Sequence, residues 1–338
     1  MPLFKRPRIG LVLGGGAARG LAHIGILKVL ERERFPIDLI VGTSIGALVG
    51  GVFATLGDAE ETEQRFVRFA ESSDFRRGAF DFIREARQPK TGLLASTSAL
   101  LRRGIFYGYA AYKMSFISAE ALAHNINSLL PDVDIGETSL PFAAIAADLV
   151  SGNEVILAGG SIRTMVAASC AIPGVLPPVS VEGRTFIDGG WVDRVPSLPA
   201  LRLGAEVVVG VDIAAEGDVA PPRRGVDVMV RATAVQAHAL KQFQTRYLDC
   251  IISPEVGKIH WADFGAVREA IRLGVEAAEA ALPCLRRLVQ PRLAFTARWR
   301  QTARRRAIGM YERIEIRNGA GCRSEGVSGT EDATSVAG

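Results

Sequence analysis

The sequence feature that constrains the fold most is the turn Gly42-Thr-Ser-Ile-Gly46. An apolar stretch that begins at Leu39 leads into this turn, and small or aliphatic residues follow it as far as Leu56. Glycine on both sides of Ser44 lets a strand and a helix meet at a sharp, strained corner, because no Cβ atom clashes there. Such a corner, called a nucleophile elbow, presents the serine hydroxyl at the end of a sheet. The pattern therefore predicts strand, turn and helix, with Ser44 as a candidate nucleophile.

The same stretch has a second interpretation, as a membrane span. Leu39 to Leu56 is eighteen residues long and carries no charge, and Gly42, Gly46 and Gly50 have the four-residue spacing of packed transmembrane helices. However, Pro36 and Asp38 come directly before it, and a Thr-Ser pair interrupts it. Strands and helices of a doubly covered parallel sheet are equally apolar. We therefore favour the strand, elbow and helix.

A glycine-rich loop, Gly14-Gly-Gly-Ala-Ala-Arg-Gly20, follows the first apolar strand, Arg8 to Leu13, and precedes a helix-like pattern. Its amides would face either a pyrophosphate or the oxygen that becomes negative when a serine attacks an ester. A dinucleotide fingerprint needs glycines at relative positions 1, 3 and 6, and neither Gly14 nor Gly15 as the start satisfies it. Asp38 also precedes the next strand instead of ending it. The nucleotide interpretation remains the weaker alternative.

Composition places the chain among ordinary globular proteins, with 48% hydrophobic and 22% charged residues over 338 positions, a length typical of about two domains. The net charge of +4 favours anionic surfaces such as phospholipid headgroups, although charge alone does not separate these from nucleic acid. The four cysteines are scattered, which favours reduced thiols and a cytoplasmic setting. The apolar run after the basic start is broken at Gly14–Gly16, so we expect no signal peptide.

Residues 58–118 are polar, basic and aromatic without clear periodicity. We favour a helical insertion whose aromatic residues pack in the core over a lid that covers an acyl groove. The aromatic residues concerned are Phe75, Phe80, Phe82, Phe106, Tyr107, Tyr109, Tyr112 and Phe116.

Later strands are expected at 141–147, 153–157, 184–187 and 206–212, and helices after Ser161 and over 196–203. Residues 216–225 are typical of a linker. Two apolar stripes then predict helices, Val228 to Tyr247 and Val267 to Leu285, with Pro283 as a kink. Residues 286–317 carry ten Arg and two acidic residues, which favours a solvated helix face over a membrane-surface stripe.

Three motifs together resemble the patatin-like phospholipase family. They are Gly14–Gly20, Gly42–Gly46 and Asp188-Gly-Gly190, in this order and each at a strand end. Similar supporting stretches are 147–152, 168–174 and Pro196, whereas Arg194-Val195 stands where the family usually has Asn. The resemblance covers residues 8–215. It implies a three-layer α/β/α fold with a mainly parallel central sheet and 8–215 as the catalytic domain. The two apolar stripes make 216–317 a helical extension packed on or beside it, and the Gly, Ser and Thr content of 318–338 predicts a disordered tail.

The resemblance also implies a catalytic dyad, with Ser44 as the nucleophile and Asp188 as its partner. A serine hydroxyl needs a base that accepts its proton, and a carboxylate whose pKa is raised by burial can serve. The amides of Gly14, Gly15 and Gly16 would stabilise the oxyanion, and no metal or cofactor is needed. Arg19 would fix the loop or anchor an anionic headgroup, and Asp148 is expected to be structural. The other motif-supporting residues are Gly20, Gly42, Gly46, Gly189 and Gly190.

A Ser-His-acid triad would use His238 or His260 after Ser44. In an α/β-hydrolase several strands precede the elbow, whereas only one does here, so we expect all four histidines to be structural or surface groups. The prediction is a serine acyl hydrolase that cleaves phospholipid or lysophospholipid through an acyl-enzyme, at a membrane surface without a transmembrane anchor and with no nucleic-acid partner. A non-catalytic member of the same fold and a dinucleotide-binding oxidoreductase remain as alternatives.

Overall fold

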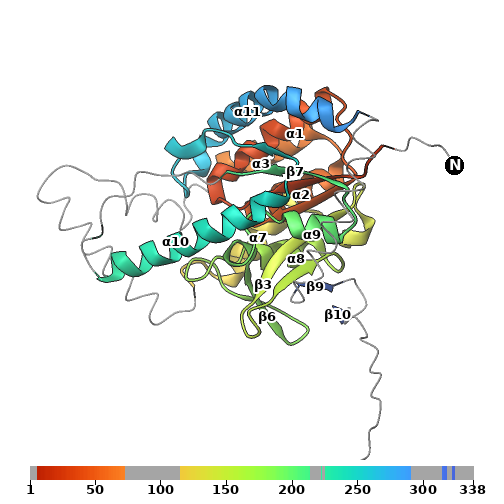
Figure 1. Ribbon diagram of the computed structural model, residues 1–338. Coiled ribbons are helices and arrows are strands. Elements are labelled where there is room, and N and C mark those ends of the chain that lie inside the picture. The colour runs from red at the N-terminus through yellow and green to blue at the C-terminus, as the bar shows by residue number, and fades with distance from the viewer. Residues whose placement is uncertain are drawn as a thin grey trace, which may run out of the picture.

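A mixed sheet runs through the molecule, and helices cover both of its faces (Figure 1). The computed structural model describes residues 6–72, 115–213, 222, 225–290, 314–317 and 322–323. The main strand order is β10-β9-β4-β3-β2-β1-β7-β8, and the five strands from β3 to β8 are mutually parallel. The strands are β1 (Ile9–Leu13), β2 (Leu39–Thr43), β3 (Phe142–Asp148), β4 (Glu154–Leu157), β5 (Val179–Val181), β6 (Arg184–Asp188), β7 (Val207–Val211), β8 (Cys250–Ile252), β9 (Ile314–Arg317) and β10 (Cys322–Arg323).

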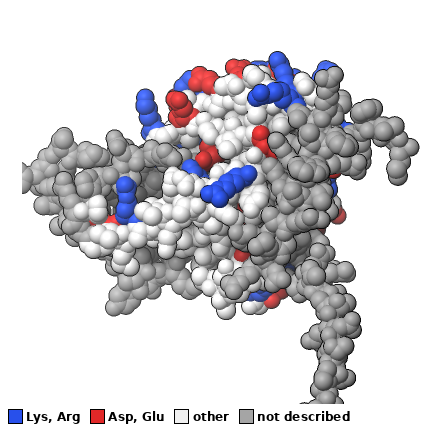
Figure 2. Space-filling view, viewed as in Figure 1, with Lys and Arg blue, Asp and Glu red and all other residues white. Residues whose placement is uncertain are grey.

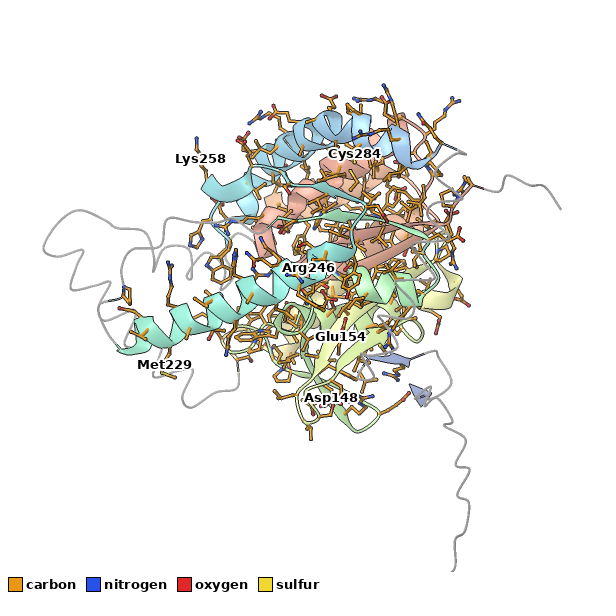
Figure 3. All side chains as sticks on the ribbon, viewed as in Figure 1. Asp148, Glu154, Met229, Arg246, Lys258 and Cys284 are labelled. Carbon is orange, nitrogen blue, oxygen red and sulfur yellow. The ribbon has the colours of Figure 1, made fainter. Side chains whose placement is uncertain are left out.

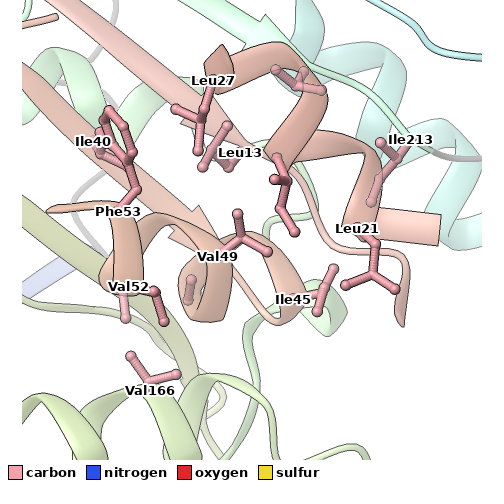
Figure 4. Close-up of a cluster of buried hydrophobic side chains, with 14 of the residues drawn as sticks. Leu13, Leu21, Leu27, Ile40, Ile45, Val49, Val52, Phe53, Val166 and Ile213 are labelled. Carbon is pink, nitrogen blue, oxygen red and sulfur yellow. The ribbon is translucent and has the colours of Figure 1, made fainter. Parts of the chain in front are cut away.

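Alternating strand residues supply two cores, one on each face of the sheet. Leu11 and Leu13 point to the larger core, while Val12 points to the smaller one, as the period of two in a strand requires. Figure 4 shows the larger core, where Val49 and Phe53 lie among strand residues such as Leu13. The helices on this face are α1 (Ala22–Arg32), α2 (Ile45–Leu56), α3 (Ala59–Glu71), α7 (Ala119–Leu129), α8 (Ile162–Ser169) and α11 (Val267–Leu288).

The opposite face is covered by α9 (Ser197–Arg202) and by the end of α10 (Gly225–Gln244). Helices on both faces of a mainly parallel sheet make the three layers predicted from the sequence, and the expected fold class is confirmed.

Helices α1 and α11 pack unusually closely, because glycines face each other's main chain. A Cβ atom on Gly274 would lie 2.0 Å from the carbonyl oxygen of Ala22, and one on Gly25 would lie 2.0 Å from that of Ile271. Helix α11 also continues through Pro283, where the sequence predicted a kink. The second predicted stripe therefore belongs to one long helix, α11, which packs on α1.

Several elements were predicted only in outline or not at all. Helix α3 lies in the segment 58–118, for which a helical insertion was favoured without bounds, and α7 follows that segment. The strands β8 and β9 extend the sheet on both edges beyond the last predicted strand. Ser161 stands at the N-cap of α8, but its side chain makes no capping hydrogen bond. Of the aromatic residues proposed for a lid, Phe116 packs against the larger core, and Phe75 to Tyr112 lie outside the described residues.

The regions beyond residue 215 contribute to the same sheet and core. β8 pairs with β7, β9 pairs with β4, and α11 packs on α1. The basic run after Gln290 and the tail from 318 lie outside the described residues, apart from β9 and β10. None of the helices in the described ranges combines the length and the apolar run that crossing a bilayer requires.

Candidate active site

Ser44 occupies a strained corner between β2 and α2. Its backbone has φ 56° and ψ −124°, a conformation that non-glycine residues rarely adopt. A Cβ atom on Gly42 would lie 2.4 Å from the carbonyl oxygen of Gly46, and one on Gly46 would lie 2.1 Å from that of Leu13. The two glycines are therefore required by the close approach of the turn to itself and to β1, as the spacing in the sequence predicted.

The side chain of Asp188 lies against the Ser44 hydroxyl. Ser44 Oγ donates a hydrogen bond of 2.6 Å to Asp188 Oδ2 across 144 sequence positions, and both residues are buried. Asp188 ends β6, and its other oxygen, Oδ1, accepts the amide of Gly190 at 2.7 Å. A Cβ atom on Gly189 would lie 2.2 Å from the carbonyl oxygen of Ile145, so this glycine allows the turn to approach β3.

Burial brings the pKa of the Asp188 carboxyl group close to neutral pH. It raises the pKa of Asp188 to about 6, although the hydrogen bonds from Ser44 and Gly190 and the charge of Arg194 lower it. At neutral pH the group is therefore mostly ionised, and its affinity for a proton is much higher than that of an exposed aspartate. This combination suits a general base for the adjacent hydroxyl.

The glycine loop lies directly beside Ser44, since a Cβ atom on Gly15 would be 3.4 Å from Ser44 Cβ. Two of its amides already have acceptors. Gly14 donates to the carbonyl oxygen of Val211 at 3.1 Å, and Gly15 donates to that of Arg194 at 3.0 Å. Among the hydrogen bonds of the described residues, the Gly16 amide has no acceptor. Of the three amides predicted to form the oxyanion hole, two thus hold the loop in this structure.

His23 and Arg19 fix the same loop from behind. Burial lowers the pKa of His23 to about 4, so the ring is neutral, and its Nε2 lies 2.8 Å from the carbonyl oxygen of Gly14. Because a carbonyl only accepts, Nε2 must carry the proton. Arg19 Nε donates to the carbonyl oxygen of Ile259 at 2.8 Å, and the Ala18 amide donates to that of Trp261 at 2.9 Å. These contacts tie the loop to residues 259–261.

Ser169 is a site residue to which the sequence analysis assigned no role. Its hydroxyl accepts the Ser44 amide at 3.0 Å and donates to the carbonyl oxygen of Ile145 at 2.6 Å. It therefore connects the elbow to β3 within the buried interior. The available signal was its place in the stretch 168–174, which resembles the family.

A pair of acids, the half-buried Glu154 and the buried Asp193, lies behind the loop that carries Asp188. Burial raises the pKa of Glu154 to about 7, and burial together with the Glu154 charge raises that of Asp193. The Asp193 amide donates to the carbonyl oxygen of Gly189 at 2.8 Å, and its own carbonyl accepts the Thr43 hydroxyl at 2.9 Å. Asp193 thus links the neighbours of both predicted catalytic residues.

A largely apolar cavity of about 70 Å³ opens beside Ser44. Its walls suit a hydrocarbon chain better than a polar group. The lining residues are Ala17, Ser44, Ile45, Leu48, Phe69, Leu122, Asn125, Ile126, Leu129, Cys170, Ile172, Leu176 and Phe264.

The other candidates have different partners. His238 lies on the exposed α10 with its Nε2 2.9 Å from Gln242, and His260 Nδ1 accepts the Ala262 amide. Asp148 accepts the amides of Val150 and Ser151 and pairs with Arg184, which fits the structural role expected of it. Within the described ranges, no group of three or more metal-ligating side chains could hold a metal ion.

Comparison with known proteins gives consistent matches. The family model described as patatin-like phospholipase matches residues 11–201. An uncharacterized NTE family protein of Mycobacterium tuberculosis is 32% identical over 226 residues, which cover 67% of this chain and 54% of that protein. Lysophospholipase NTE1 of Mycosarcoma maydis is 30% identical over 217 residues, 64% of this chain and 10% of that protein. The chain thus spans about half the length of its mycobacterial relative.

Among solved structures, VipD from Legionella pneumophila matches with 13% identity and a TM-score of 0.40, over 83% of this chain and 67% of that chain.

Proposed function

Because the chain belongs to the patatin-like phospholipase family, we propose that it is a serine acyl hydrolase acting on lipid esters, with phospholipids or lysophospholipids as substrates. The observation that carries the proposal is the 2.6 Å hydrogen bond from Ser44 Oγ to a buried carboxylate at a strained elbow. An acid and a hydroxyl so arranged, beside an apolar cavity, have the parts that ester cleavage needs.

In the acylation step, Ser44 Oγ attacks the ester carbonyl carbon while Asp188 accepts the hydroxyl proton. Asp188 then returns this proton to the departing alcohol as the tetrahedral intermediate collapses. In the deacylation step, water attacks the acyl carbon while Asp188 accepts its proton. Asp188 then returns the proton to Ser44 Oγ as the fatty acid leaves. Both oxygens of Asp188 are engaged in the resting state, which holds the carboxylate toward Ser44.

We assign the oxyanion donors to the amides of Gly16 and Ala17. Among the described residues neither amide has an acceptor, and Ala17 lines the cavity next to Ser44. Amide donors of this kind typically lower the activation barrier by about 3–4 kcal/mol. Gly14 and Gly15 then act by holding the loop, together with His23.

The cavity is assigned to the acyl chain of the substrate. Its walls come from α2, α3, α7 and the turn after α8, and Asn125 is the one amide side chain among them. Moving an acyl chain from water into such a site lowers its free energy by about 0.8 kcal/mol for each buried methylene group. The name of the fungal relative, a lysophospholipase, supports lysophospholipid as the first substrate to test.

Labelling with a fluorophosphonate probe tests the proposal. Wild-type protein should react at Ser44, Ser44→Ala should not react, and Asp188→Asn should react much more slowly. Ser151→Ala, which changes an exposed serine, is the matched control and should label like the wild type. Release of fatty acid from lysophosphatidylcholine should follow the same order.

An unlabelled wild-type protein would instead support a non-catalytic member of the fold. Turnover that is indifferent to Ser44→Ala would contradict the proposed nucleophile.

A further inference from the structure

Helix α10 projects from the body of the protein and is held at one end (Figure 1). At its last turn, Phe243 packs against the smaller core. Gln244 Nε2 donates to the carbonyl oxygen of Val192 at 2.8 Å, and Ser197 Oγ donates to that of Gln244 at 2.6 Å. These contacts anchor the C-terminal end of the helix and leave its N-terminal part beyond the core.

The face of α10 that packs at this anchored end continues uncovered along the rest of the helix. The helical period places Val228 and Val235 to one side of Phe243, by about 60–80°, and Met229 and Leu240 to its other side, by about 40–60°. These four exposed residues are half of the eight large apolar side chains that are exposed in the described ranges, and Met229 and Val235 are 72% and 61% exposed. From Val228 to Leu240 the uncovered face is about 18 Å long.

The side of α10 opposite Phe243 is mixed, with the charged or polar Asp227, Arg231, His238 and Lys241 beside the small Ala234 and Ala237. Asp227, Arg231 and Lys241 are its charged residues, and Lys241 pairs with Asp212 at 3.0 Å. In the space-filling view, uncharged atoms cover most of this helix (Figure 2). Helices that lie in a membrane interface bury an apolar face and keep polar and basic residues on the other side, where α10 carries Arg231, His238 and Lys241.

The exposed part of α10 lies toward the edge of the sheet that holds the candidate active site. Strands β7 and β8 are parallel, so α10 leads from the carboxyl end of β7 back to the start of β8, and its first turns lie on the carboxyl side. Ser44 follows the carboxyl end of β2 on the same edge. Figure 3 shows Met229 at the projecting end of the helix and Arg246 near the anchored end.

An exposed tryptophan lies close to the acid along the chain. Trp191 is three positions after Asp188 and 52% exposed, and the α10 anchor at Val192 is the next residue. The exposed Leu149 and Val150 lie farther away, beside the start of β6, where the Leu149 amide donates to the carbonyl oxygen of Thr185. Tryptophan is favoured where protein meets the headgroup layer of a bilayer.

We propose that the apolar face of α10, together with Trp191, docks the protein on a phospholipid bilayer and so presents the Ser44 cavity to lipid. The proposal rests on the proposed function for its choice of lipid as occupant. A bilayer fits better than a second copy of the chain, because one narrow helix face offers far less area than the ~800 Å² per partner of a stable dimer. The net charge of +4 and the exposed Lys258, on the loop that holds Arg19, favour anionic lipid.

Co-sedimentation with vesicles of phosphatidylcholine and phosphatidylglycerol in equal parts tests the docking. All proteins carry Ser44→Ala, so binding is measured without consuming the lipid. Adding Val235→Asp should weaken vesicle binding about tenfold or more, since a charge replaces an apolar side chain that enters the interface. The matched control is Ala234→Asp, which adds the same charge at the adjacent exposed position, on the side of the helix opposite Phe243. This control should bind like the parent.

In the Ser44-containing background, Val235→Asp should lower turnover of vesicle lipid while leaving turnover of a short-chain ester unchanged. Equal vesicle binding by Val235→Asp and Ala234→Asp would overturn the proposal. It would also be overturned if ultracentrifugation found a dimer that Val235→Asp separates, because the face would then join two copies. Absence of short-chain turnover in the wild type would refute the proposed function and leave the binding result intact.

Discussion

Replacing Asp188 with asparagine should stabilise the fold at neutral pH, even though it removes the proposed base. On folding, burial raises the pKa of this carboxyl group from 3.8 to about 6. The folded state therefore binds more protons than the unfolded chain between these values, and stability falls as the pH rises through them. The difference corresponds to about 3 kcal/mol of stability lost by pH 8. Asparagine carries no ionisable group and avoids this loss.

The measurement is the free energy of unfolding of Asp188→Asn and of the wild type by urea denaturation at several pH values between pH 3 and pH 8, a range that includes both pKa values, 3.8 and about 6. A weaker hydrogen bond from the asparagine amide would shift the free energy of unfolding of the variant by the same amount at every pH. The informative quantity is therefore how the difference in unfolding free energy between variant and wild type changes with pH. It should grow by about 3 kcal/mol in favour of the variant from the acid to the neutral end.

The matched control is Asp132→Asn, which removes a carboxylate whose side chain is 74% exposed. Its difference from the wild type should stay nearly constant over the same range. If the Asp188→Asn difference is also flat, or favours the variant mainly at acid pH, the carboxyl group is not held in an environment that disfavours its charge, and its assignment as the base loses its physical support.

Four further outcomes follow from the structure. In the wild type, kcat/KM should rise with pH through about 6, because Asp188 must be ionised to act as a base, and a flat profile would contradict this role. Gly274→Ala should destabilise the protein by about 1–3 kcal/mol or more in urea unfolding, since its Cβ would meet a main-chain oxygen of α1, whereas Gly225→Ala, with open space around it, should not. Ser169→Ala removes the acceptor of the buried Ser44 amide and a donor to the Ile145 carbonyl, and should cost about 1–3 kcal/mol of stability with a fall in kcat. Ile126→Trp should reduce turnover of long-chain esters more than that of short ones.

The sequence was most informative where geometry is local. Gly42 and Gly46 predicted a tight strand-to-helix corner, and the near contacts at both positions explain why. The pairing of Ser44 with Asp188 across 144 positions followed from the family resemblance and not from the residues, because no local pattern encodes which strand end lies beside the elbow. The structure supplies that pairing through β3, which neighbours both β2 and β6.

Other parts of the fold were missed for identifiable reasons. Helix α3 did carry a start signal, since Asp58 caps the Glu61 amide and acidic residues fill the first turn. The role of Ser169 depends on how the end of α8 meets β3, and the three-residue strand Cys250–Ile252 is defined by its partner β7 and not by its own pattern. Tertiary context determines such elements.

Burial acts in opposite directions on the pKa values of Asp188 and His23, and this explains why a carboxylate can serve without an imidazole. It raises the pKa of Asp188 to about 6, close to the optimum for a base at neutral pH, and lowers that of His23 to about 4. A histidine placed against Ser44 in the same apolar surroundings would likewise lose proton affinity unless a buried carboxylate supported it, which is the part that the acid of a triad plays. Here the acid contacts the hydroxyl directly. His23 instead stays neutral while Asp188 titrates, so the glycine loop keeps its hydrogen bond across the whole range in which the base changes charge.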